Sequence, residues 1–317
     1  MLKPRLIFPL FSLGLLIAAR AADADAGPVP TETPSGDAVI RAPFGGSEIV
    51  ITTTSRLAGA IHSVTWNGKE FIDSTDHGRQ LQSASSFDNS PTAPPETFNP
   101  TEAGSMRDGA GPRSTSRLLE IRSSPGELHT RTQMAFWLTP ADRSAGVPAR
   151  NTAALSGHLL AKQVRIGVPG SPNVLDYTVT FTVPAGEPHA TAQFEALTGY
   201  MPAEFARVWH LNPATRKLEP LTDGPGEQRD PVALSTDDGK YAMGIIAPDP
   251  APAGSAGPSY GRFRFAAEKV VKWNCVFRVR PADGALPPGE YRHRLLVPIG
   301  TLADVEAALA KLAAPPL

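Results

Sequence analysis

The stretch that decides the fold is residues 61–72, which reads IHSVTWNGKEFI. Val64 and Trp66 are apolar on either side of the polar Thr65, an alternation typical of a strand with one buried face. The Asn67-Gly68 dipeptide follows and supplies the two positive φ angles of a type I′ hairpin turn. We therefore predict a β-hairpin in which residues 64–66 pair with residues 71–72.

The same period-two alternation recurs along the chain on both sides of this hairpin. It is clearest in residues 174–183, where the apolar side chains at 177, 179, 181 and 183 share one face and polar side chains share the other. About a dozen short strands favour an all-β sandwich or barrel. Besides these two segments, strands are expected at 48–51, 117–122, 133–138, 190–195, 207–211, 241–247, 262–265, 269–280 and 291–299.

A helix is expected only at the C-terminus, after Gly300. Thr301 can cap it, and Asp304 lies three residues further on, as a capping box requires. An apolar stripe follows at Leu302, Val305, Leu309 and Leu312. Three segments resist assignment to strands and are expected to be long loops: 83–111, 140–151 and 249–258.

The first 21 residues have the pattern of a signal peptide. Lys3 and Arg5 precede a short apolar run, and Ala19-Arg20-Ala21 then has the small-x-small pattern of a cleavage site. We expect residues 22–37, rich in Ala, Asp, Pro and Thr, to be a flexible leader, and residues 38–317 to be a single β-sandwich domain. The mature protein is then expected in the periplasm or outside the cell.

Composition and motifs exclude several function classes. The chain carries 30 basic and 31 acidic residues, a net charge of −1, so no overall field recruits nucleic acid or an anionic membrane. The single cysteine, Cys275, can form no internal disulfide, and phosphate-loop, dinucleotide and Gly-x-Ser-x-Gly motifs are absent. None of the seven histidines has metal-ligand spacing to another. The sequence thus predicts no cofactor, no metal and neither nucleic acid nor membrane as a partner.

The densest polar cluster follows the hairpin at residues 73–83, DSTDHGRQLQS. His77 and Arg79 are candidate catalytic residues, because an imidazole exchanges protons near neutral pH and a guanidinium binds carboxylates. Gln80 and Gln82, on the other face of the same strand, are candidates for substrate binding. In the alternative interpretation these side chains only bond to the backbone and to a carboxylate at the sheet edge.

A second cluster lies in the longest expected loop. Glu102 is the third candidate catalytic residue, and Asn99, Arg107 and Asp108 are candidates for binding sugar hydroxyls. Asn-Pro and Asp-Gly pairs in the same segment form turns, so the alternative is a solvated surface loop.

Aromatic residues beside polar positions are a third set of candidate binding residues. Trp137 follows Phe136, and Trp209 precedes His210. An indole face suits the C–H face of a pyranose, so Trp137, Trp209 and His210 are candidates for substrate binding. The alternative is that these rings belong to the core.

Residues 61–72 followed by HGRQLQ at 77–82 resemble the galactose-mutarotase-like supersandwich proteins. The resemblance implies a single large antiparallel β-sandwich, a supersandwich, and a sugar as ligand. That group includes aldose epimerases, polysaccharide lyases and glycosidases. The second catalytic histidine and the late glutamate of the aldose epimerases have no match here, so the reaction stays open.

The sequence therefore predicts a secreted carbohydrate-active protein that binds or processes a sugar or polysaccharide in a concave β-sheet cleft. As an epimerase it would use His77 with Glu102, and as a lyase Arg79 would neutralise a uronate carboxylate. As a glycosidase it would pair Glu102 with Asp108 or Glu195. The alternative is a non-catalytic glycan-binding or structural β-sandwich module.

Overall fold

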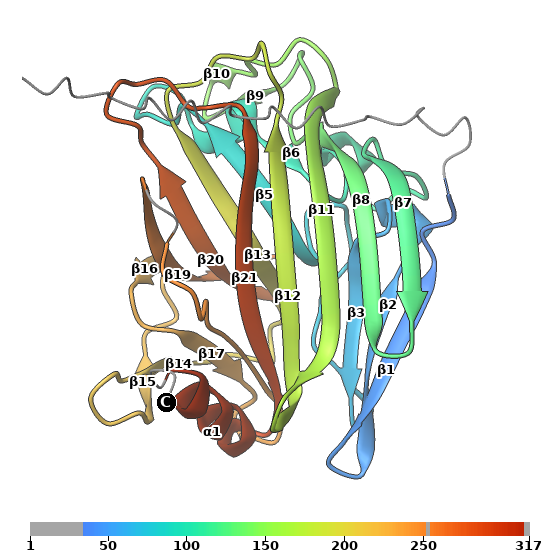
Figure 1. The fold of residues 1–317 in the computed structure, drawn as a ribbon, viewed down its shortest axis with the longest axis vertical. Helices are drawn as coiled ribbons and strands as arrows, with labels where there is room; N and C mark the ends of the chain where they lie inside the picture. Colours follow the sequence, from blue (N-terminus) through green and yellow to red (C-terminus); the bar gives the residue numbers. More distant parts are fainter. Residues whose placement is uncertain (1–33, 252–253, 314–317) are drawn as a thin grey trace, which may run out of the picture. The chain divides into compact units, whose positions relative to one another are not determined.

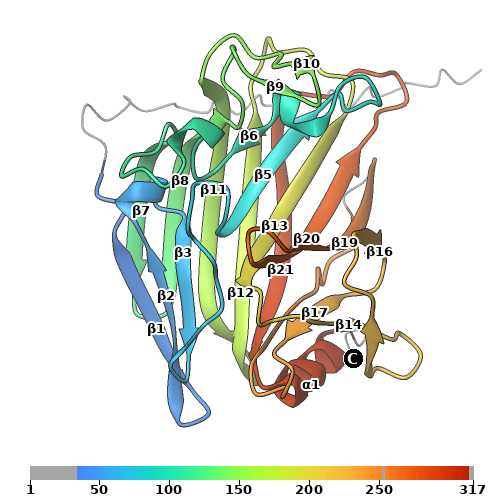
Figure 2. The same cartoon turned by 180° about the vertical axis from the view of Figure 1, so that it is seen from behind.

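Two layers of antiparallel strands pack face to face in the computed structural model, which describes residues 34–251 and 254–313 (Figure 1). The first sheet lies in front in Figure 1 and the second in front in Figure 2. This arrangement confirms the predicted all-β, antiparallel sandwich. The predicted signal peptide (1–21) and residues 22–33 of the predicted leader lie outside the described residues.

The first sheet is ordered by its pairings, each of which is antiparallel. In spatial order its strands are β7 (Arg117–Ser124), β8 (Glu127–Phe136), β11 (Leu155–Val168), β12 (Ser171–Val183), β21 (Gly289–Gly300), β18 (Ala242–Ile245), β17 (Val232–Ser235), β14 (Arg207–Leu211) and β15 (Leu218–Leu221).

The second sheet is also antiparallel throughout. In spatial order its strands are β1 (Ala38–Phe44), β2 (Ser47–Thr53), β3 (Ile61–Trp66), β5 (Leu81–Phe87), β13 (Ala192–Pro202), β20 (Val270–Val279), β19 (Ser255–Phe265) and β16 (Gly226–Gln228). The short β4 (Lys69–Glu70) pairs with β3. The short β6 (Pro100–Thr101) pairs with both β5 and β8 and so joins the two sheets.

The core fills the space between the two sheets. The inward residues of β12, from Tyr177 to Val183, are at most 2% exposed, as the alternation predicts. They pack with apolar side chains from both sheets in one continuous cluster. Cys275 is buried in the same cluster with a free thiol whose pKa burial raises. Its reactivity is thereby suppressed, because the thiolate is the nucleophile.

The predicted hairpin turn is confirmed, but the strand that returns from it is β4 at Lys69–Glu70 rather than residues 71–72. Asn67 and Gly68 have φ angles of 49° and 74°, and Trp66 pairs with Lys69 across the turn. Phe71 continues the pairing, since its N–H donates to the carbonyl oxygen of Val64 at 2.9 Å.

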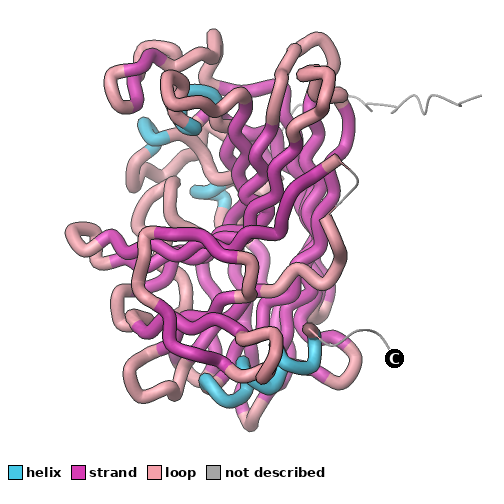
Figure 3. Tube along the Cα trace, turned by 90° about the vertical axis from the view of Figure 1, so that its left-hand side faces the viewer, coloured by secondary structure: helices cyan, strands magenta, loops and turns pink. Residues whose placement is uncertain are grey.

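The predicted C-terminal helix is also confirmed as α1 (Leu302–Leu312). Thr301 caps it, and the Asp304 carboxylate accepts from the Thr301 N–H at 2.9 Å. Val305 and Leu309 are buried against the first sheet. Figure 3 shows strands through the body of the sandwich and helical segments at its margin. No helix in the described part of the chain is long and apolar enough to cross a membrane.

Several expected boundaries were wrong. Residues 83–87 belong to β5, so the long loop begins at Asp88, and β19 already begins at Ser255. The long β11 was missed altogether. The last residues of the predicted leader are fixed rather than flexible: the Gly36 N–H donates to Ser55 Oγ at 2.8 Å. Short pieces complete the fold: β9 (Arg143–Ser144) with β10 (Val147–Pro148), and the 3-10 turns η1 (Ser55–Leu57), η2 (Pro95–Phe98) and η3 (Met106–Asp108).

Candidate functional site

A groove of about 460 Å³ lies on the second sheet, over β5, β13 and β20. Residues of η2, β9 and the segment just after β8 form its remaining wall. Figure 2 shows β9, β10 and the turn before β6 at one end of β5. The groove is lined by Gly78, Gln82, Ala84, Ser85, Ser86, Pro94, Pro95, Glu96, Asn99, Thr101, Trp137, Ser144, Glu195, Thr198, Tyr200 and Lys272.

An ion pair lies within this lining. Lys272 Nζ of β20 is 3.1 Å from Glu195 Oε2 of β13, and the Thr198 hydroxyl donates to the same oxygen at 2.9 Å. The Glu195 and Lys272 side chains are 26% and 12% exposed, so both charged groups reach the groove surface. A carboxylate, an ammonium and a hydroxyl are therefore fixed side by side.

The charges of this pair are mutually reinforced. Burial raises the pKa of Glu195, but the Lys272 ammonium and the Thr198 hydroxyl outweigh burial and hold that pKa below its usual value. Burial lowers the pKa of Lys272, and Glu195 and Tyr200 reverse this, so the pKa of Lys272 is raised. Both groups are ionised at neutral pH.

Aromatic rings flank the pair. The Lys272 Nζ lies 5.2 Å from the ring centre of Tyr200 and 5.3 Å from that of Phe263, within range of a cation–π contact. Trp137 lies on the opposite wall, against Gly78. A Cβ atom at position 78 would come within 2.7 Å of Trp137 Cη2, so the indole can approach only because residue 78 is glycine.

Three predicted binding residues meet in the groove: Gln82, Asn99 and Trp137. The Gln82 Nε2 donates to the Gly78 carbonyl oxygen at 2.9 Å, while its buried Oε1 has no hydrogen-bond partner among the described residues. Asn99 Nδ2 donates to the Ser85 carbonyl oxygen. Gln82 thus lines the groove with a side chain whose acceptor is buried and unpaired.

His77 and Arg79 have structural partners instead. His77 is 1% exposed, and its Nδ1 and Nε2 lie 2.6 and 2.9 Å from the carbonyl oxygens of Gly109 and Arg56. Arg79 Nη2 is 2.8 Å from Asp76 Oδ2. Neither residue lines the groove, and both make the contacts of the alternative interpretation, to the backbone and to a carboxylate.

Glu102 is likewise not a groove carboxylate. Its side chain and that of Lys162 are 0% exposed and form an ion pair between the sheets. Glu102 Oε2 also accepts from the Ser83 N–H at 3.1 Å. Because the carboxylate is sealed from solvent and already paired, it is part of the core.

Gln80, Arg107 and Asp108 also support the fold. Gln80 is fully buried and donates to the Asp76 carbonyl oxygen. Arg107 donates to Asp142 Oδ1 at 2.9 Å, and this contact lowers the pKa of Asp142 to about 2. The Asp108 carboxylate caps its own turn by accepting from the Ser105 N–H at 2.7 Å.

Trp209 and His210 lie elsewhere in the molecule. Both belong to β14, beside α1 and at the opposite end of the sandwich from β9 and β10 (Figures 1 and 2). Trp209 Nε1 donates to Ser235 Oγ at 3.0 Å, and His210 Nδ1 is 3.2 Å from Asp230 Oδ2. Neither lines the groove, so these two candidates lie apart from Gln82, Asn99 and Trp137.

Lys272 and Tyr200 are the groove residues that the sequence analysis missed, and Glu195 entered it only as a second carboxylate. The available signal was a single charge inside an otherwise apolar strand, as in VVKWNCVF at 270–277. A charge at such a position has to be paired or face a solvent-filled site.

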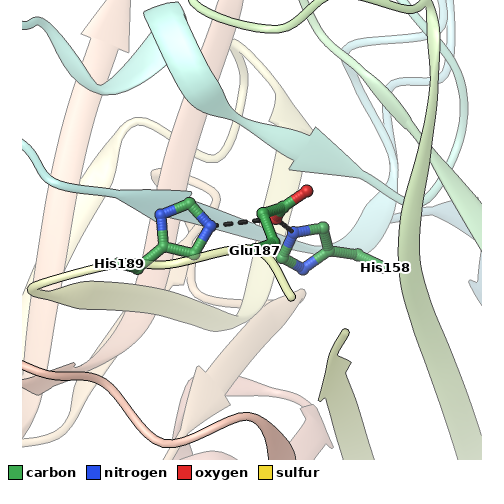
Figure 4. A group of neighbouring side chains, drawn as sticks. All are labelled: His158, Glu187 and His189. Atoms are coloured by element: carbon green, nitrogen blue, oxygen red, sulfur yellow. Dashed lines mark hydrogen bonds and ion pairs between the residues drawn. The ribbon is translucent and has the colours of Figure 1, made fainter. Parts of the chain in front are cut away.

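A second polar group lies outside the groove (Figure 4). His158 of β11 meets Glu187 and His189 of the β12–β13 connection, and their ligand atoms lie within 4.8 Å of one another. Sequence spacing gave no sign of this group because His158 comes from a different strand. These residues are the kind of group that spacing in the sequence does not reveal, because it is assembled from positions distant in the chain.

No protein-family model matches this chain, and no curated protein sequence matches it. Among solved structures, it is similar to a protein from Synechocystis sp. PCC 6803, with 10% identity over 86% of this chain and 99% of that one and a TM-score of 0.43. It is also similar to an alpha-mannosidase from Enterococcus faecalis V583 (12% identity, 87% and 32% covered, TM-score 0.46). A heparan sulfate lyase mutant from Pedobacter heparinus follows (8% identity, 87% and 37% covered, TM-score 0.41).

Proposed function

We propose that this chain binds a carbohydrate in the groove over β5, β13 and β20. The observation that carries the proposal is the Glu195–Lys272 pair, which lies in an open groove with Trp137 and Tyr200 in its walls. Fixed charged and polar groups beside aromatic faces suit a ligand that has hydroxyl groups on its edges and C–H bonds on its faces.

Several fixed groups are needed because each contributes little. A neutral hydrogen bond nets about 0.5–1.5 kcal/mol against water, and one to a charged group about 1.5–3 kcal/mol. Glu195 supplies a charged acceptor, Lys272 a charged donor and Thr198 a neutral hydroxyl beside them. Together they match the neighbouring hydroxyls of a sugar ring better than they match an apolar ligand.

The same groove supports proton transfer. The ionised Glu195 is the proposed proton acceptor, because its pKa lies below the usual value and it is therefore deprotonated at neutral pH. Lys272, with its raised pKa, acts as a fixed positive charge that stabilises negative charge on the substrate rather than as an acid. A positioned carboxylate can act as a general base, and glycosidases use carboxylates in this way.

The second candidate is a non-catalytic glycan-binding module. It is favoured by the mutual neutralisation of Glu195 and Lys272, which gives specific hydrogen bonding without a free base. Export to the periplasm or medium is part of either proposal and rests on the charged and apolar pattern of residues 1–21. N-terminal sequencing of the mature protein tests it.

A glycan array followed by calorimetry tests the binding proposal. We expect a glycan that binds the wild type to bind Glu195→Gln and Trp137→Ala about tenfold or more weakly, which corresponds to about 1.4 kcal/mol. Trp209→Ala, a tryptophan outside the groove, is the matched control and should bind as the wild type does. Product analysis with the bound glycans separates an enzyme from a binding module.

The proposal fails if no glycan binds, or if the two groove variants bind as the wild type does. Circular dichroism of each variant checks that the fold is retained.

A further inference from the structure

His158, Glu187 and His189 converge on one point between β11 and the β12–β13 connection. Glu187 Oε1 lies 2.5 Å from His158 Nε2 and 2.9 Å from His189 Nε2 (Figure 4). The two histidine side chains are 2% and 4% exposed, and Glu187 is 30% exposed. The group is therefore closed on the histidine side and reachable by solvent on the carboxylate side.

Asp88 holds His189 in the orientation that a metal-binding histidine needs. His189 Nδ1 lies 2.8 Å from Asp88 Oδ2, and Asp88 Oδ1 accepts from the N–H groups of Ala190 and Thr191 at 2.7 and 3.0 Å. A carboxylate on the second ring nitrogen fixes the orientation and tautomer of a metal-binding histidine, as in many zinc proteins.

Aromatic packing limits movement of both imidazoles. The Phe87 ring stacks on His189 with 4.4 Å between ring centres and lies 4.7 Å from His158. Phe98 packs edge-on against His189 at 5.0 Å. The two rings are therefore held with their Nε2 atoms directed at Glu187, whose partly exposed side chain is the one free to adjust.

We propose that His158 Nε2, His189 Nε2 and a Glu187 carboxylate oxygen bind a divalent transition-metal ion of the Zn²⁺ type, with water at the fourth position. Two imidazoles and one carboxylate suit Zn²⁺, whereas Ca²⁺ and Mg²⁺ prefer oxygen ligands alone. Three protein ligands leave one position of a tetrahedral site for water.

The geometry requires only a small adjustment. Metal–ligand bonds of about 2.0–2.1 Å in a tetrahedral site place neighbouring ligand atoms about 3.4 Å apart. The separations of 2.5 and 2.9 Å from Glu187 Oε1 to the two Nε2 atoms are shorter, so Glu187 has to retreat by less than about 1 Å. The ligand atoms of the two histidines lie within 4.8 Å of each other, so the imidazoles have to settle at the same spacing of about 3.4 Å.

Metal binding at this site should also release a proton. Without metal, Glu187 Oε1 accepts from both Nε2 atoms and Asp88 accepts from His189 Nδ1, so His189 donates from both ring nitrogens. Metal binding must displace the Nε2 proton of His189 into solvent, while His158 moves its proton to Nδ1.

Calorimetry on the full chain, freed of metal with EDTA and titrated with ZnCl2, tests the proposal. We expect one bound equivalent, a binding enthalpy that changes with the ionisation enthalpy of the buffer, and a rise in Tm on Zn²⁺ addition. Visible absorption of added Co²⁺ reports four-coordinate geometry independently.

Variants distinguish Zn²⁺ binding at this site from adventitious Zn²⁺ binding on the surface. Glu187→Gln should lose Zn²⁺ binding, and Asp88→Asn should weaken it about 10–100-fold while leaving all three ligands in place. His210→Gln is the matched control, since His210 also contacts a carboxylate, Asp230, and it should bind as the wild type does. The proposal is overturned if the wild type binds no Zn²⁺ or Co²⁺, or if Glu187→Gln binds them as the wild type does.

Discussion

Two glutamate–lysine pairs of the same chemistry lie on opposite sides of the second sheet. Glu195 and Lys272 line the groove with 26% and 12% of their side chains exposed. Glu102 and Lys162 lie between the sheets with 0% exposed. Both pairs join segments far apart in the sequence, but only the first can meet a ligand.

The difference shows that burial, rather than residue type, decides what such a pair does. Inside the sandwich, both charges have lost water, and each depends on the other for compensation. In the groove, water still reaches the carboxylate, so the pair can exchange solvent for a ligand at modest cost. The buried pair is therefore expected to govern stability, and the groove pair is expected to govern binding.

The largest expected effect follows removal of one buried charge. Lys162→Met leaves the Glu102 carboxylate uncompensated, and we expect a loss of about 3–5 kcal/mol in the free energy of unfolding, measured with urea. The double variant Lys162→Met/Glu102→Gln removes both charges and should recover part of that loss. A single variant as stable as the wild type would contradict the buried pairing.

A smaller effect on stability is expected in the groove. Lys272→Met should cost about 1 kcal/mol or less, because the pair is partly solvated. It should, however, move the pKa of Glu195 upward toward or above its usual 4.5, since Lys272 is the main group that lowers it. The acid limb of glycan binding, followed by calorimetry from pH 3 to 7, should therefore shift to higher pH. If the pH dependence of binding is the same in Lys272→Met and in the wild type, ionisation of Glu195 does not control glycan binding.

The Glu187–His189 pair adds a case of intermediate burial. The pKa of Glu187 is lowered to about 2, so its contribution to stability is complete above 4.5 and is lost as pH falls toward 2. The pKa of His189 is raised, so its contribution is complete below 6.5 and is lost as pH rises through the folded-state pKa. With EDTA present, Glu187→Gln should lower stability most between about pH 4.5 and 6.5, by about 1–2 kcal/mol. If Glu187→Gln loses as much stability at pH 3 as between pH 4.5 and 6.5, the contact between ionised Glu187 and His189 is not the cause of the loss.

The smallest effect on stability is expected at the groove wall. Gly78→Ala brings a methyl group within 2.7 Å of Trp137 Cη2, so the indole has to move. We expect a change in stability of about 1 kcal/mol or less but weaker glycan binding, measured by calorimetry. Gly68→Ala is not a suitable control because of its φ of 74°, whereas Gly157→Ala, with φ in the ordinary range, tests a glycine outside the groove.

The candidate site was only partly predictable. Gln82, Asn99 and Trp137 stood in polar segments next to strands and do line the groove. His77 and Glu102 have the same residue types as catalytic groups, but their partners are backbone carbonyls and Lys162. Those partners lie 21 to 60 residues away in sequence, so local composition carried no information about them.

The missed strand β11 has the same cause. His158 and Lys162 occupy inward positions where alternation predicts apolar side chains, and they hide its period-two pattern. They are tolerated inside because Glu187 and Glu102 compensate them. The polar residues that obscured the strand are therefore those with buried partners.

The sequence by itself determined the local structure: the Asn67-Gly68 turn, the inward face of β12 and the capped helix α1. Each of these depends on neighbouring residues, whose backbone angles and periodicity can be derived from the chain. The tertiary structure alone decided which glutamates are buried and which face a ligand. That outcome depends on the pairing of strands distant in sequence, because such pairing sets both the distance between charges and their access to water.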